Sequence, residues 1–473
     1  MDGRRRFLVA AAGFVLLVVA GSVGADEVAL DWSIEYHSPY PYWDEALAVA
    51  LDGDGNVIVA GNVLREITNE YQYGDIVTVF HDDLLVLKYD PAGNLLWSLS
   101  RDGGVGDYKI ARLVVDAAGN IVVGGNLGNN MDGIVVGIDP DGTERWARPL
   151  SQDDHQSLTA LVAAPDGGVI AVGFWTCPVM RLNGAGEIQW STTYVPTTGE
   201  TAACSSSAVD STGNVWAVGT LYYADYADTD FLVLKYDAAG TLLWAATYGG
   251  PAEMASEDHA LAVGVDGDGN AVVTGGVQTA GPSGSCADMT TAMATVKFDP
   301  GGGLLWARLR GGVPRQIPPK DAGMELAINA AGGIVVQGVE NGSTITVAYD
   351  AAGNELWSDR PDDFGSGGWG CLPWSDFKEL AMDGSGRIYR AHIPSDGRSD
   401  VESFDSAGGV RWSASVDAVV YAIAVGASGD VAVAGAHDAN VFTAKFSQSD
   451  DDSGDDAGGS DSGSGKKHPG CGR

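Results

Sequence analysis

Residues 230–250, DFLVLKYDAAGTLLWAATYGG, have the pattern of two β-strands joined by one tight turn. Successive side chains from 231 to 236 alternate between two sets, the period of a strand with two distinct faces. In the turn, Asp237 can accept a hydrogen bond from the backbone ahead of it. Gly240 can take the left-handed conformation that lets the chain return, and the second strand then reaches Trp244. The stretch therefore predicts a β-hairpin.

The same spacing of turn residue, glycine and tryptophan recurs along the chain. The further copies are Asp90/Gly93/Trp97, Asp139/Gly142/Trp146, Asn183/Gly186/Trp190, Asp299/Gly302/Trp306, Asp350/Gly353/Trp357 and Asp405/Gly408/Trp412. Chance does not produce seven hairpins in one register, so the chain is a repeat array. A tryptophan at a constant position in a strand is expected to fill the space between neighbouring repeats rather than to contact a ligand.

A second hairpin precedes each copy of the first. Its turn glycines are Gly55, Gly119, Gly167, Gly213, Gly269, Gly332, Gly386 and Gly429. Each of these eight units therefore holds four strands, called a to d in chain order, with tight a–b and c–d turns. Four-stranded units of about 40 to 50 residues in series are typical of a β-propeller. The sequence thus predicts an all-β fold, an eight-bladed β-propeller of four-stranded blades.

The eighth unit lacks its fourth strand, because the chain passes from Phe446 into a polar tail without another turn or tryptophan. Residues 30–34, LDWSI, are similar to residues 95–99, LLWSL. We therefore expect an N-terminal strand containing Trp32 to complete the last blade and close the ring. Such a closure removes an unpaired edge and ties down a terminus that would otherwise fray.

Composition limits the partners of the protein. The 473 residues include 27 Lys and Arg against 63 Asp and Glu, a formal net charge of −36. Binding of nucleic acid needs clustered basic side chains, so nucleic acid is not an expected partner. An acidic surface instead fits an exported protein that stays soluble.

The two ends of the chain differ from the repeats. Residues 4–6 are arginines, 7–20 are apolar, and 23–25 are small residues suited to cleavage, so residues 1–25 are expected to be a signal peptide. No other stretch could cross a bilayer. We expect residues 26–447 to form the propeller, and the Ser, Asp and Gly-rich residues 448–473 to be a disordered acidic tail. The mature protein is therefore expected to be a secreted or cell-surface monomer.

The repeats resemble a known family. DFLVLKYDAAGTLLWAATYGG, VDGDGNAVVTGG and VDAAGNIVVGGN are similar to repeats of the secreted bacterial β-propeller repeat (SBBP-type) family, whose function is largely open. The Asp-Gly-Trp element also resembles the tryptophan-docking motif of quinoprotein eight-bladed propellers, with one residue fewer between Asp and Gly. The adjacent cysteine pair of those dehydrogenases is absent, and the Asp-box of sialidases matches less well. The resemblance therefore implies the scaffold, and no cofactor is expected.

The long connections are expected on the face opposite to the tight turns. They span 62–82, 220–229, 278–290, 314–323 and 359–376. Variable loops on a rigid scaffold are the usual place for recognition, and Tyr and Trp are common anchors. The candidate binding residues are Tyr40, Tyr42, Trp43, Tyr71, Tyr73, Tyr222, Tyr223, Tyr226, Trp369 and Trp374. The alternative is that these rings only pack the loops onto the rim.

Aspartates recur near the start of strand a, which lines the central channel of a propeller. They are Asp44, Asp107, Asp258 and Asp376. These carboxylates could form an acidic ring at the channel mouth, or they could accept hydrogen bonds from backbone amides where each loop enters its strand. Such local bonding to the backbone is the commoner role of Asp, so we favour it.

Metal and catalytic motifs are not found. Asp52-Gly-Asp54-Gly and Asp266-Gly-Asp268-Gly resemble calcium loops but lack the later bidentate Glu, so we interpret both as turns. None of the seven histidines has metal-ligand spacing to another, and no metal is expected. Without a Gly-x-Ser-x-Gly motif, a phosphate loop or a Cys/His nucleophile pair, no catalytic residue is assigned.

The five cysteines fit an oxidising compartment. Cys177 and Cys204 are expected on the same face of neighbouring blades and form the first disulfide candidate. Cys286 and Cys371 share that face but lie further apart round the ring, and Cys471 is left over.

We therefore expect an exported, non-catalytic propeller that binds a protein or a glycan through its long-loop face. Two alternatives stay open. One is an enzyme centred on the channel, quinoprotein-like or acting on a polysaccharide, and the other is a structural component of the cell surface.

Overall fold

The structure is a computed structural model. It describes residues 28–38, 44–72, 75–102, 108–127, 132–150, 156–197, 199–223, 228–251, 256–280, 290–312, 321–341, 343–361, 379–392 and 398–448. The predicted signal peptide and nearly all of the predicted acidic tail lie outside these residues. Within them the chain forms thirty-two β-strands.

The strands make eight four-stranded antiparallel sheets, which we number as blades in chain order. Blade 1 is β2 (Glu45–Leu51), β3 (Val57–Gln72), β4 (Asp75–Tyr89) and β5 (Leu95–Asp102). Blade 2 is β6 (Tyr108–Val115), β7 (Ile121–Leu127), β8 (Asp132–Ile138) and β9 (Glu144–Pro149). Blade 3 is β10 (Leu158–Ala163), β11 (Val169–Gly173), β12 (Pro178–Leu182) and β13 (Ile188–Thr193). Blade 4 is β14 (Thr201–Val209), β15 (Val215–Tyr222), β16 (Thr229–Tyr236) and β17 (Leu242–Tyr248).

The second half of the ring repeats this order. Blade 5 is β18 (His259–Val265), β19 (Ala271–Ala280), β20 (Thr290–Phe298) and β21 (Leu304–Gly311). Blade 6 is β22 (Ala322–Ile328), β23 (Ile334–Glu340), β24 (Ser343–Tyr349) and β25 (Glu355–Asp359). Blade 7 is β26 (Leu380–Met382), β27 (Ile388–His392), β28 (Ser399–Phe404) and β29 (Val410–Val416). Blade 8 is β30 (Val419–Val425), β31 (Val431–His437), β32 (Asn440–Gln448) and β1 (Val28–Tyr36).

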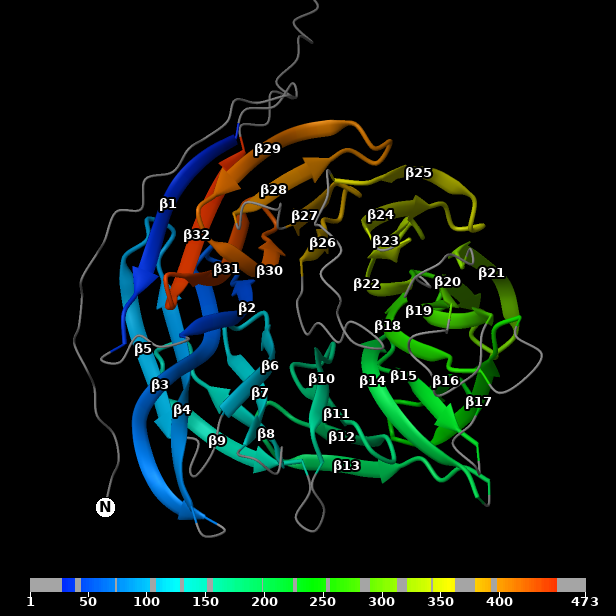
Figure 1. Cartoon of the computed structure of the whole chain (residues 1–473), viewed down its shortest axis with the longest axis horizontal. Helices are drawn as coiled ribbons and strands as arrows, with labels where there is room; N and C mark the ends of the chain where they lie inside the picture. The colour runs from blue at the N-terminus through cyan, green and yellow to red at the C-terminus, as the bar shows by residue number, and fades with distance from the viewer. Residues whose placement is uncertain are drawn as a thin grey trace, which may run out of the picture.

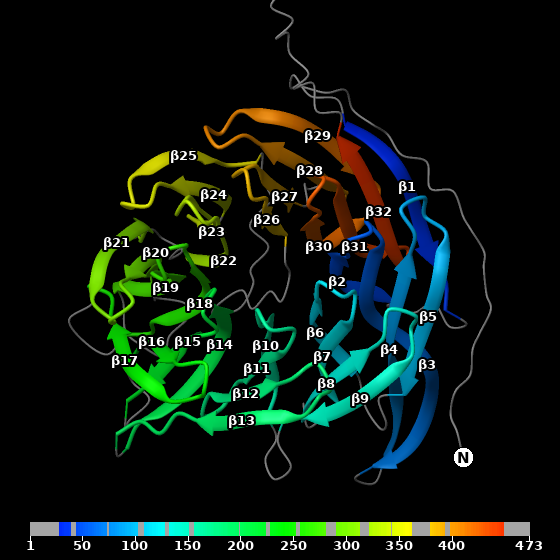
Figure 2. The same ribbon diagram turned by 180° about the vertical axis from the view of Figure 1, so that it is seen from behind.

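The eight sheets stand round a common axis. Figure 1 shows the first strand of each blade nearest the centre and the fourth strand at the rim, and Figure 2 shows the same ring from behind. Neighbouring inner strands contact one another all round the ring, including β2 with β30. The predicted eight-bladed propeller is therefore confirmed.

The first described strand completes the last blade. β1 pairs antiparallel with β32, from Val28 opposite Gln448 to Tyr36 opposite Val441. Lys445 of β32 lies 3.4 Å from Asp31 of β1, measured from Nζ to Oδ2. The predicted closure of the ring by an N-terminal strand is confirmed, and both views show β1 beside β32 (Figures 1 and 2).

The quoted hairpin shows how each tight turn is held. Asp237 Oδ1 accepts hydrogen bonds from the backbone N–H groups of Ala239, at 2.9 Å, and Thr241, at 2.8 Å. Gly240 has a φ of 84°, in the left-handed region that a residue with a Cβ adopts at a cost. Its N–H donates to the Asp237 carbonyl at 3.0 Å, which closes the turn.

Each turn glycine of the c–d hairpins also receives a tryptophan ring from the preceding blade. A Cβ on Gly240 would lie 2.6 Å from the Trp190 ring, while Trp190 Nε1 donates to the Ala238 carbonyl at 3.0 Å. The other pairs of this kind are Trp32–Gly93, Trp97–Gly142, Trp146–Gly186, Trp244–Gly302, Trp306–Gly353 and Trp357–Gly408. Trp412 differs, because blade 8 has no c–d turn, and is fully buried against Phe446. The repeated tryptophan therefore joins each blade to the next.

Strand c carries a buried lysine in four blades, at Lys88, Lys235, Lys297 and Lys445. The first three reinforce this joint, because each donates to a carbonyl of the next blade. Lys445 instead pairs with Asp31 and Asp430 of its own blade. Lys297 Nζ lies 2.9 Å from Asp266 Oδ2 in the a–b turn of its own blade and donates to the Ala351 carbonyl of the next blade at 3.1 Å. Burial alone would raise the pKa of Asp266, but hydrogen bonds from Asn270 and Lys297 outweigh burial and hold that pKa below its usual value.

The apolar core lies between the blades. One cluster joins Ile170 and Val172 of β11 to Leu232 and Leu234 of β16, all with no solvent exposure. Because each sheet packs on both neighbours, the ring is a rigid frame on which the connections are carried.

Candidate functional site

The two faces of the disc are built differently. The a–b and c–d connections are tight turns, each closed by a bond from the fourth-position glycine N–H to the carbonyl three residues earlier. On the opposite face, the b–c connections range from a two-residue turn at Asp438 and Ala439 to an extended hairpin. The variable connections therefore share one face, which we call the long-loop face.

The longest connection in the first blade is not a loop. We expected residues 62–82 to be a long loop, and this was wrong, because β3 and β4 stay paired from Val57 opposite Tyr89 to Gln72 opposite Asp75. The stretch is rich in Ile, Val, Thr, Tyr and Phe, which favour a pleated strand. Figure 1 shows this hairpin extending beyond the neighbouring β2 and β5. The predicted anchor Tyr71 lies in β3.

Most predicted aromatic anchors lie outside the described residues. They are Tyr40, Tyr42, Trp43, Tyr73, Tyr226, Trp369 and Trp374. Tyr222 and Tyr223 are described, at the end of β15. The Tyr223 hydroxyl donates to Asp230 Oδ2 at 2.6 Å, and burial and this carboxylate raise the pKa of Tyr223 well above its usual value. Tyr223 is therefore tied to β16, whereas Tyr222 is in contact with other rings.

One ring close to Tyr222 belongs to Trp175, which sequence reasoning did not single out. The two ring centroids are 6.3 Å apart, and Tyr222 also lies 6.5 Å from the imidazole of His259. Trp175 is 48% exposed and is held edge-on by Phe174 at 4.8 Å. The available signal was a tryptophan outside the repeat register, two residues before a cysteine. Three neighbouring blades thus contribute rings to one patch of the long-loop face.

The backbone at Trp175 and Thr176 is held by hydrogen bonding to blade 4. Trp175 forms a β-bridge with Ala203 of blade 4, and Thr176 donates its N–H to the Ala202 carbonyl at 2.8 Å. Thr176 and Cys177 have φ values of 59° and 48°, left-handed conformations that persist only where the surroundings impose them. The exposed indole is therefore presented by a constrained turn.

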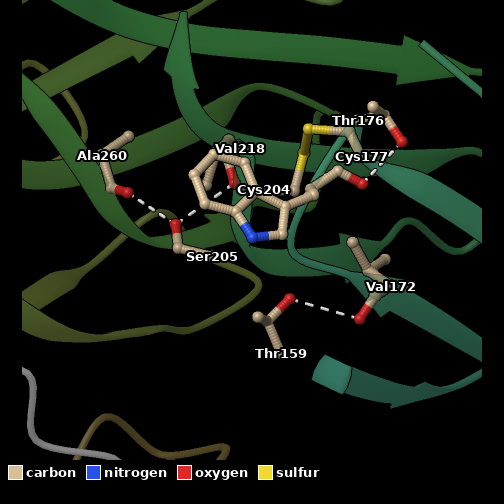
Figure 3. The surroundings of a disulfide bond; sticks show 9 residues. Thr159, Val172, Thr176, Cys177, Cys204, Ser205, Val218 and Ala260 are labelled. Atoms are coloured by element: carbon tan, nitrogen blue, oxygen red, sulfur yellow. Dashed lines mark hydrogen bonds between the residues drawn. A yellow bond between two sulfur atoms is a disulfide. The ribbon is translucent and has the colours of Figure 1, made fainter. Parts of the chain in front are cut away.

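The constraint includes a disulfide between neighbouring blades. Cys177 of blade 3 and Cys204 of β14 are bonded, with Cα atoms 4.9 Å apart, so the first predicted pair is confirmed. Figure 3 shows this bond beside Thr176 and the strand residues Ser205 and Val218. Ser205 Oγ lies close to the carbonyl of Val218, at 3.2 Å, and to that of Ala260 in blade 5, at 2.5 Å. Cys286, Cys371 and Cys471 lie outside the described residues.

Replacing both bonded cysteines by serine is expected to lower the free energy of unfolding by about 2–4 kcal/mol. The bond closes a loop of 27 residues in sequence separation and so restricts the unfolded chain. Urea unfolding measured by circular dichroism gives the difference, with Cys471→Ser as the matched control that keeps the wild-type value. Equal stability of the double variant and the wild-type protein would contradict the prediction.

Two of the predicted strand-a aspartates are described, and both bind backbone. Asp44 and Asp258 have no solvent exposure. Asp44 Oδ1 accepts from the Leu64 N–H at 3.0 Å, and Asp258 accepts from Gly250 and Gln278 at 2.5 and 2.6 Å. Burial raises the pKa of Asp44 and raises that of Asp258 to about 6. Asp107 and Asp376 lie outside the description, so the geometry of these two supports the backbone role.

Two glutamates meet at the inner strands of blades 6 and 7, Glu325 in β22 and Glu379 directly before β26. Glu379 precedes β26 in blade 7, and its backbone N–H donates to Glu325 Oε2 of blade 6 at 2.9 Å. Gln337 Nε2 lies 3.4 Å from Glu379 Oε2. Burial, together with the charge of Glu325, raises the pKa of Glu379 to about 8, and Tyr421 of β30 lies within its electrostatic reach. Sequence reasoning missed this pair because its members come from different blades.

Stability is expected to decrease as the pH rises through the titration of Glu379. Its pKa is higher in the folded chain than the usual 4.5, so the folded state holds the proton more tightly. This contribution is complete below about pH 4.5 and is lost as the pH reaches about 8. Glu379→Gln, which cannot ionise, is expected to flatten the slope in urea unfolding at a series of pH values. Glu66→Gln, on the exposed hairpin, is the control that keeps the slope, and an unchanged slope in Glu379→Gln would refute the assignment.

The calcium-like sequences are turns. Asp52 Oδ1 accepts from the N–H groups of Asp54 and Asn56 at 3.0 and 2.9 Å, and its other oxygen pairs with Lys88 at 2.9 Å. Asp266 makes the same bonds. Among the described residues, no group of three or more His, Cys, Asp and Glu side chains is arranged to hold a metal ion.

The face that carries the tight a–b and c–d turns also contains a cavity. This cavity, of about 410 Å³, lies between the a–b turns of blades 7 and 8 and is lined by polar residues, such as Ser385 and Arg387, and by apolar ones, such as Met382 and Val425. Gly426 carries no side chain at the position where most a–b turns have Asp. A small polar molecule would fit there by volume.

Comparisons with known proteins agree with the fold. A family model described as outer membrane protein assembly factor BamB matches residues 74–275, which supports the resemblance to quinoprotein-like propellers. An uncharacterized WD repeat-containing protein of Acanthamoeba polyphaga mimivirus is 22% identical over 246 residues, which is 45% of this chain and 16% of that protein. The chain therefore spans only a small part of that relative's length. In the part of the chain that the structure describes, no helix is long and apolar enough to cross a membrane.

Two solved structures are similar to the chain at low sequence identity. The WD40 domain of Toxoplasma gondii coronin is 11% identical, with 91% of this chain and 88% of that chain covered and a TM-score of 0.43. The β-propeller domain of the Trilobed protease from Pyrococcus furiosus is 8% identical, with 87% and 96% covered and a TM-score of 0.42.

Proposed function

We propose that this protein is an exported, non-catalytic binding scaffold that recognises a protein or a glycan through its long-loop face. The observation that carries the proposal is Trp175, a half-exposed ring on a turn that is held by a disulfide and a β-bridge. A large, rigid ring loses little conformational entropy when a partner covers it, which is why Trp and Tyr dominate binding anchors.

Four further features support this proposal. The residues 1–25 fit a signal peptide, and a disulfide between blades persists in the oxidising conditions outside the cytosol. The net charge of −36 disfavours nucleic acid as the partner. The resemblance to the secreted bacterial repeat family agrees with export.

The test is a screen of the purified protein on glycan arrays and in pull-downs from cell-envelope extracts, repeated with Trp175→Ala. If this ring is an anchor, the variant loses about 2 kcal/mol or more of binding free energy, roughly a 30-fold loss of affinity. Leu305→Ala is the matched control, because Leu305 is 51% exposed on the outer strand β21, away from the long-loop face, and should keep full affinity. Equal losses in both variants would argue against the site.

A channel-centred enzyme is the second candidate, and Glu379 is the observation that favours it. A carboxyl group whose pKa is raised to about 8 stays protonated near neutral pH and could donate a proton to a leaving group. Hydrolysis of a polysaccharide that Glu379→Gln abolishes would favour this candidate over the first. Binding without turnover would favour the scaffold.

A further inference from the structure

Two histidines and a glutamate meet where the ring closes. Glu35 lies near the end of β1, and His37 directly follows the last residue of that strand, with its Nε2 3.6 Å from Glu35 Oε2. His437 ends β31, and Asn440 begins β32 after the two-residue turn. These residues are about 400 positions apart in sequence and are brought together only by the pairing of β1 with β32.

Asn440 fixes the position of the proton on His37. Asn440 Nδ2 donates to the Asp438 carbonyl at 3.1 Å, so its Oδ1 is the atom that faces His37 Nδ1 at 2.8 Å. An amide oxygen only accepts, and His37 Nδ1 therefore carries the proton and donates it. In the neutral ring the lone pair is then on Nε2.

His37 Nε2 faces a carboxylate. It lies 3.6 Å from Glu35 Oε2, close enough for both atoms to contact one cation. Two ligand atoms of a tetrahedral zinc site are about 3.3 Å apart, given bonds of about 2.0–2.1 Å. The observed distance is close to that value.

The other oxygen of Glu35 is held in place. His437 Nδ1 donates to Glu35 Oε1 at 2.7 Å, which leaves Oε2 turned towards His37. The side chain of Glu35 is 11% exposed and that of His37 is 36% exposed, so the carboxylate is sheltered while the imidazole is open to solvent. Histidines that bind metal usually donate their second ring N–H to an oxygen, and ligating carboxylates are themselves hydrogen-bonded.

We propose that His37 Nε2 and Glu35 Oε2 bind one divalent transition-metal ion, Zn²⁺ or a similar ion, with water in the remaining positions. His437 and Asn440 orient the two ligands without touching the ion. Imidazole nitrogen favours such ions over Mg²⁺ and Ca²⁺, which prefer oxygen ligands. Because the orienting residues come from the last hairpin and the ligands from β1, the ion stabilises the closed ring.

The test is calorimetric titration of the purified, chelator-treated protein with Zn²⁺ and, separately, with Mg²⁺, followed by thermal unfolding in each ion. One saturable Zn²⁺ per chain and a higher melting temperature with Zn²⁺ alone are expected. His37→Ala and Glu35→Gln should abolish the binding. His437→Ala and Asn440→Ala should weaken it by about 10–100-fold, as expected for residues that only orient the ligands. Bound Co²⁺ should show d–d absorption bands that His37→Ala removes.

Controls separate this site from the tail. The double variant His468→Ala/Cys471→Ser, which removes the histidine and the cysteine of the C-terminal sequence, should bind Zn²⁺ like the wild-type protein. Thermal unfolding without metal checks that each variant is folded, and His37→Ala is the safer of the two ligand variants because its ring is partly exposed. The proposal is overturned if Zn²⁺ does not bind saturably, if His37→Ala binds it like the wild-type protein, or if the tail variant abolishes binding.

Discussion

Replacing Lys297 by methionine is expected to lower the free energy of unfolding by about 3–5 kcal/mol. The Lys297 side chain is 3% exposed and neutralises Asp266, whose side chain is 4% exposed, so the variant leaves a buried carboxylate without its cation. It also removes one of the two donors to the Ala351 carbonyl, leaving only Trp306 Nε1 at 3.2 Å. Urea unfolding followed by tryptophan fluorescence measures the loss.

The matched control is an ion pair at the surface. Arg398 and Asp417 lie 3.6 Å apart with about half of each side chain exposed, so Arg398→Met should cost less than about 1 kcal/mol. The pH gives a second check. The pKa of Asp266 is held down partly by Lys297, and in Lys297→Met protonation of this carboxyl becomes easier, so the deficit should shrink as the pH falls. A loss equal to that of the control would show that the buried pair contributes little.

Gly240→Ala is expected to cost about 2–5 kcal/mol, the sum of two effects. A Cβ in the left-handed conformation costs about 1–2 kcal/mol. The same Cβ would lie 2.6 Å from the Trp190 ring, and forcing the ring away from its packed position adds about 1–3 kcal/mol. Because the ring belongs to the preceding blade, the damage is to the joint between blades 3 and 4.

Gly167→Ala separates the two effects. Gly167 has a φ of 82°, but a Cβ there would meet no atom within 4 Å. Its replacement should therefore cost only the conformational part, about 1–2 kcal/mol. If both alanine variants lost the same stability in urea unfolding, stacking of tryptophan on glycine would not be a significant contact.

Most of the architecture could be predicted because its signals are local. A turn needs Asp and Gly at fixed positions, and the Trp that follows Gly240 repeats in register, so counting these residues gives the number of blades. The closure of the ring could also be predicted, because residues 30–34 are similar to residues 95–99, the fourth strand of the first blade. The last blade lacks a fourth strand, so residues 30–34 were assigned to it. The disulfide followed because the blades place Cys177 and Cys204 on one face of neighbouring sheets.

The features that the sequence did not predict depend mostly on contacts between residues that are far apart in the chain. The pKa of Glu379 is raised by burial and by Glu325, 54 residues earlier in the chain, and no local pattern marks either residue. Trp175 is presented by left-handed Thr176 and Cys177, residue types that rarely indicate such a turn. The extended β3–β4 hairpin was not predicted because the sequence between Gln72 and Asp75, which pair in the structure, lacks the turn signature of the repeats.

The pairing of β1 with β32 also sets the order of events during biosynthesis. A ribosome delivers Asp31 about 400 residues before its partner Lys445, whose sequence separation is 414. Until β32 is synthesised, β1 has no partner strand in its blade, and its exposed edge can pair with a strand of another chain. The equilibrium cost of so long a closure is modest, since each doubling of loop length adds only about 0.6 kcal/mol, but contacts this remote slow the rate. The final blade is therefore expected to assemble last, and chains interrupted before β32 should be the species that aggregate.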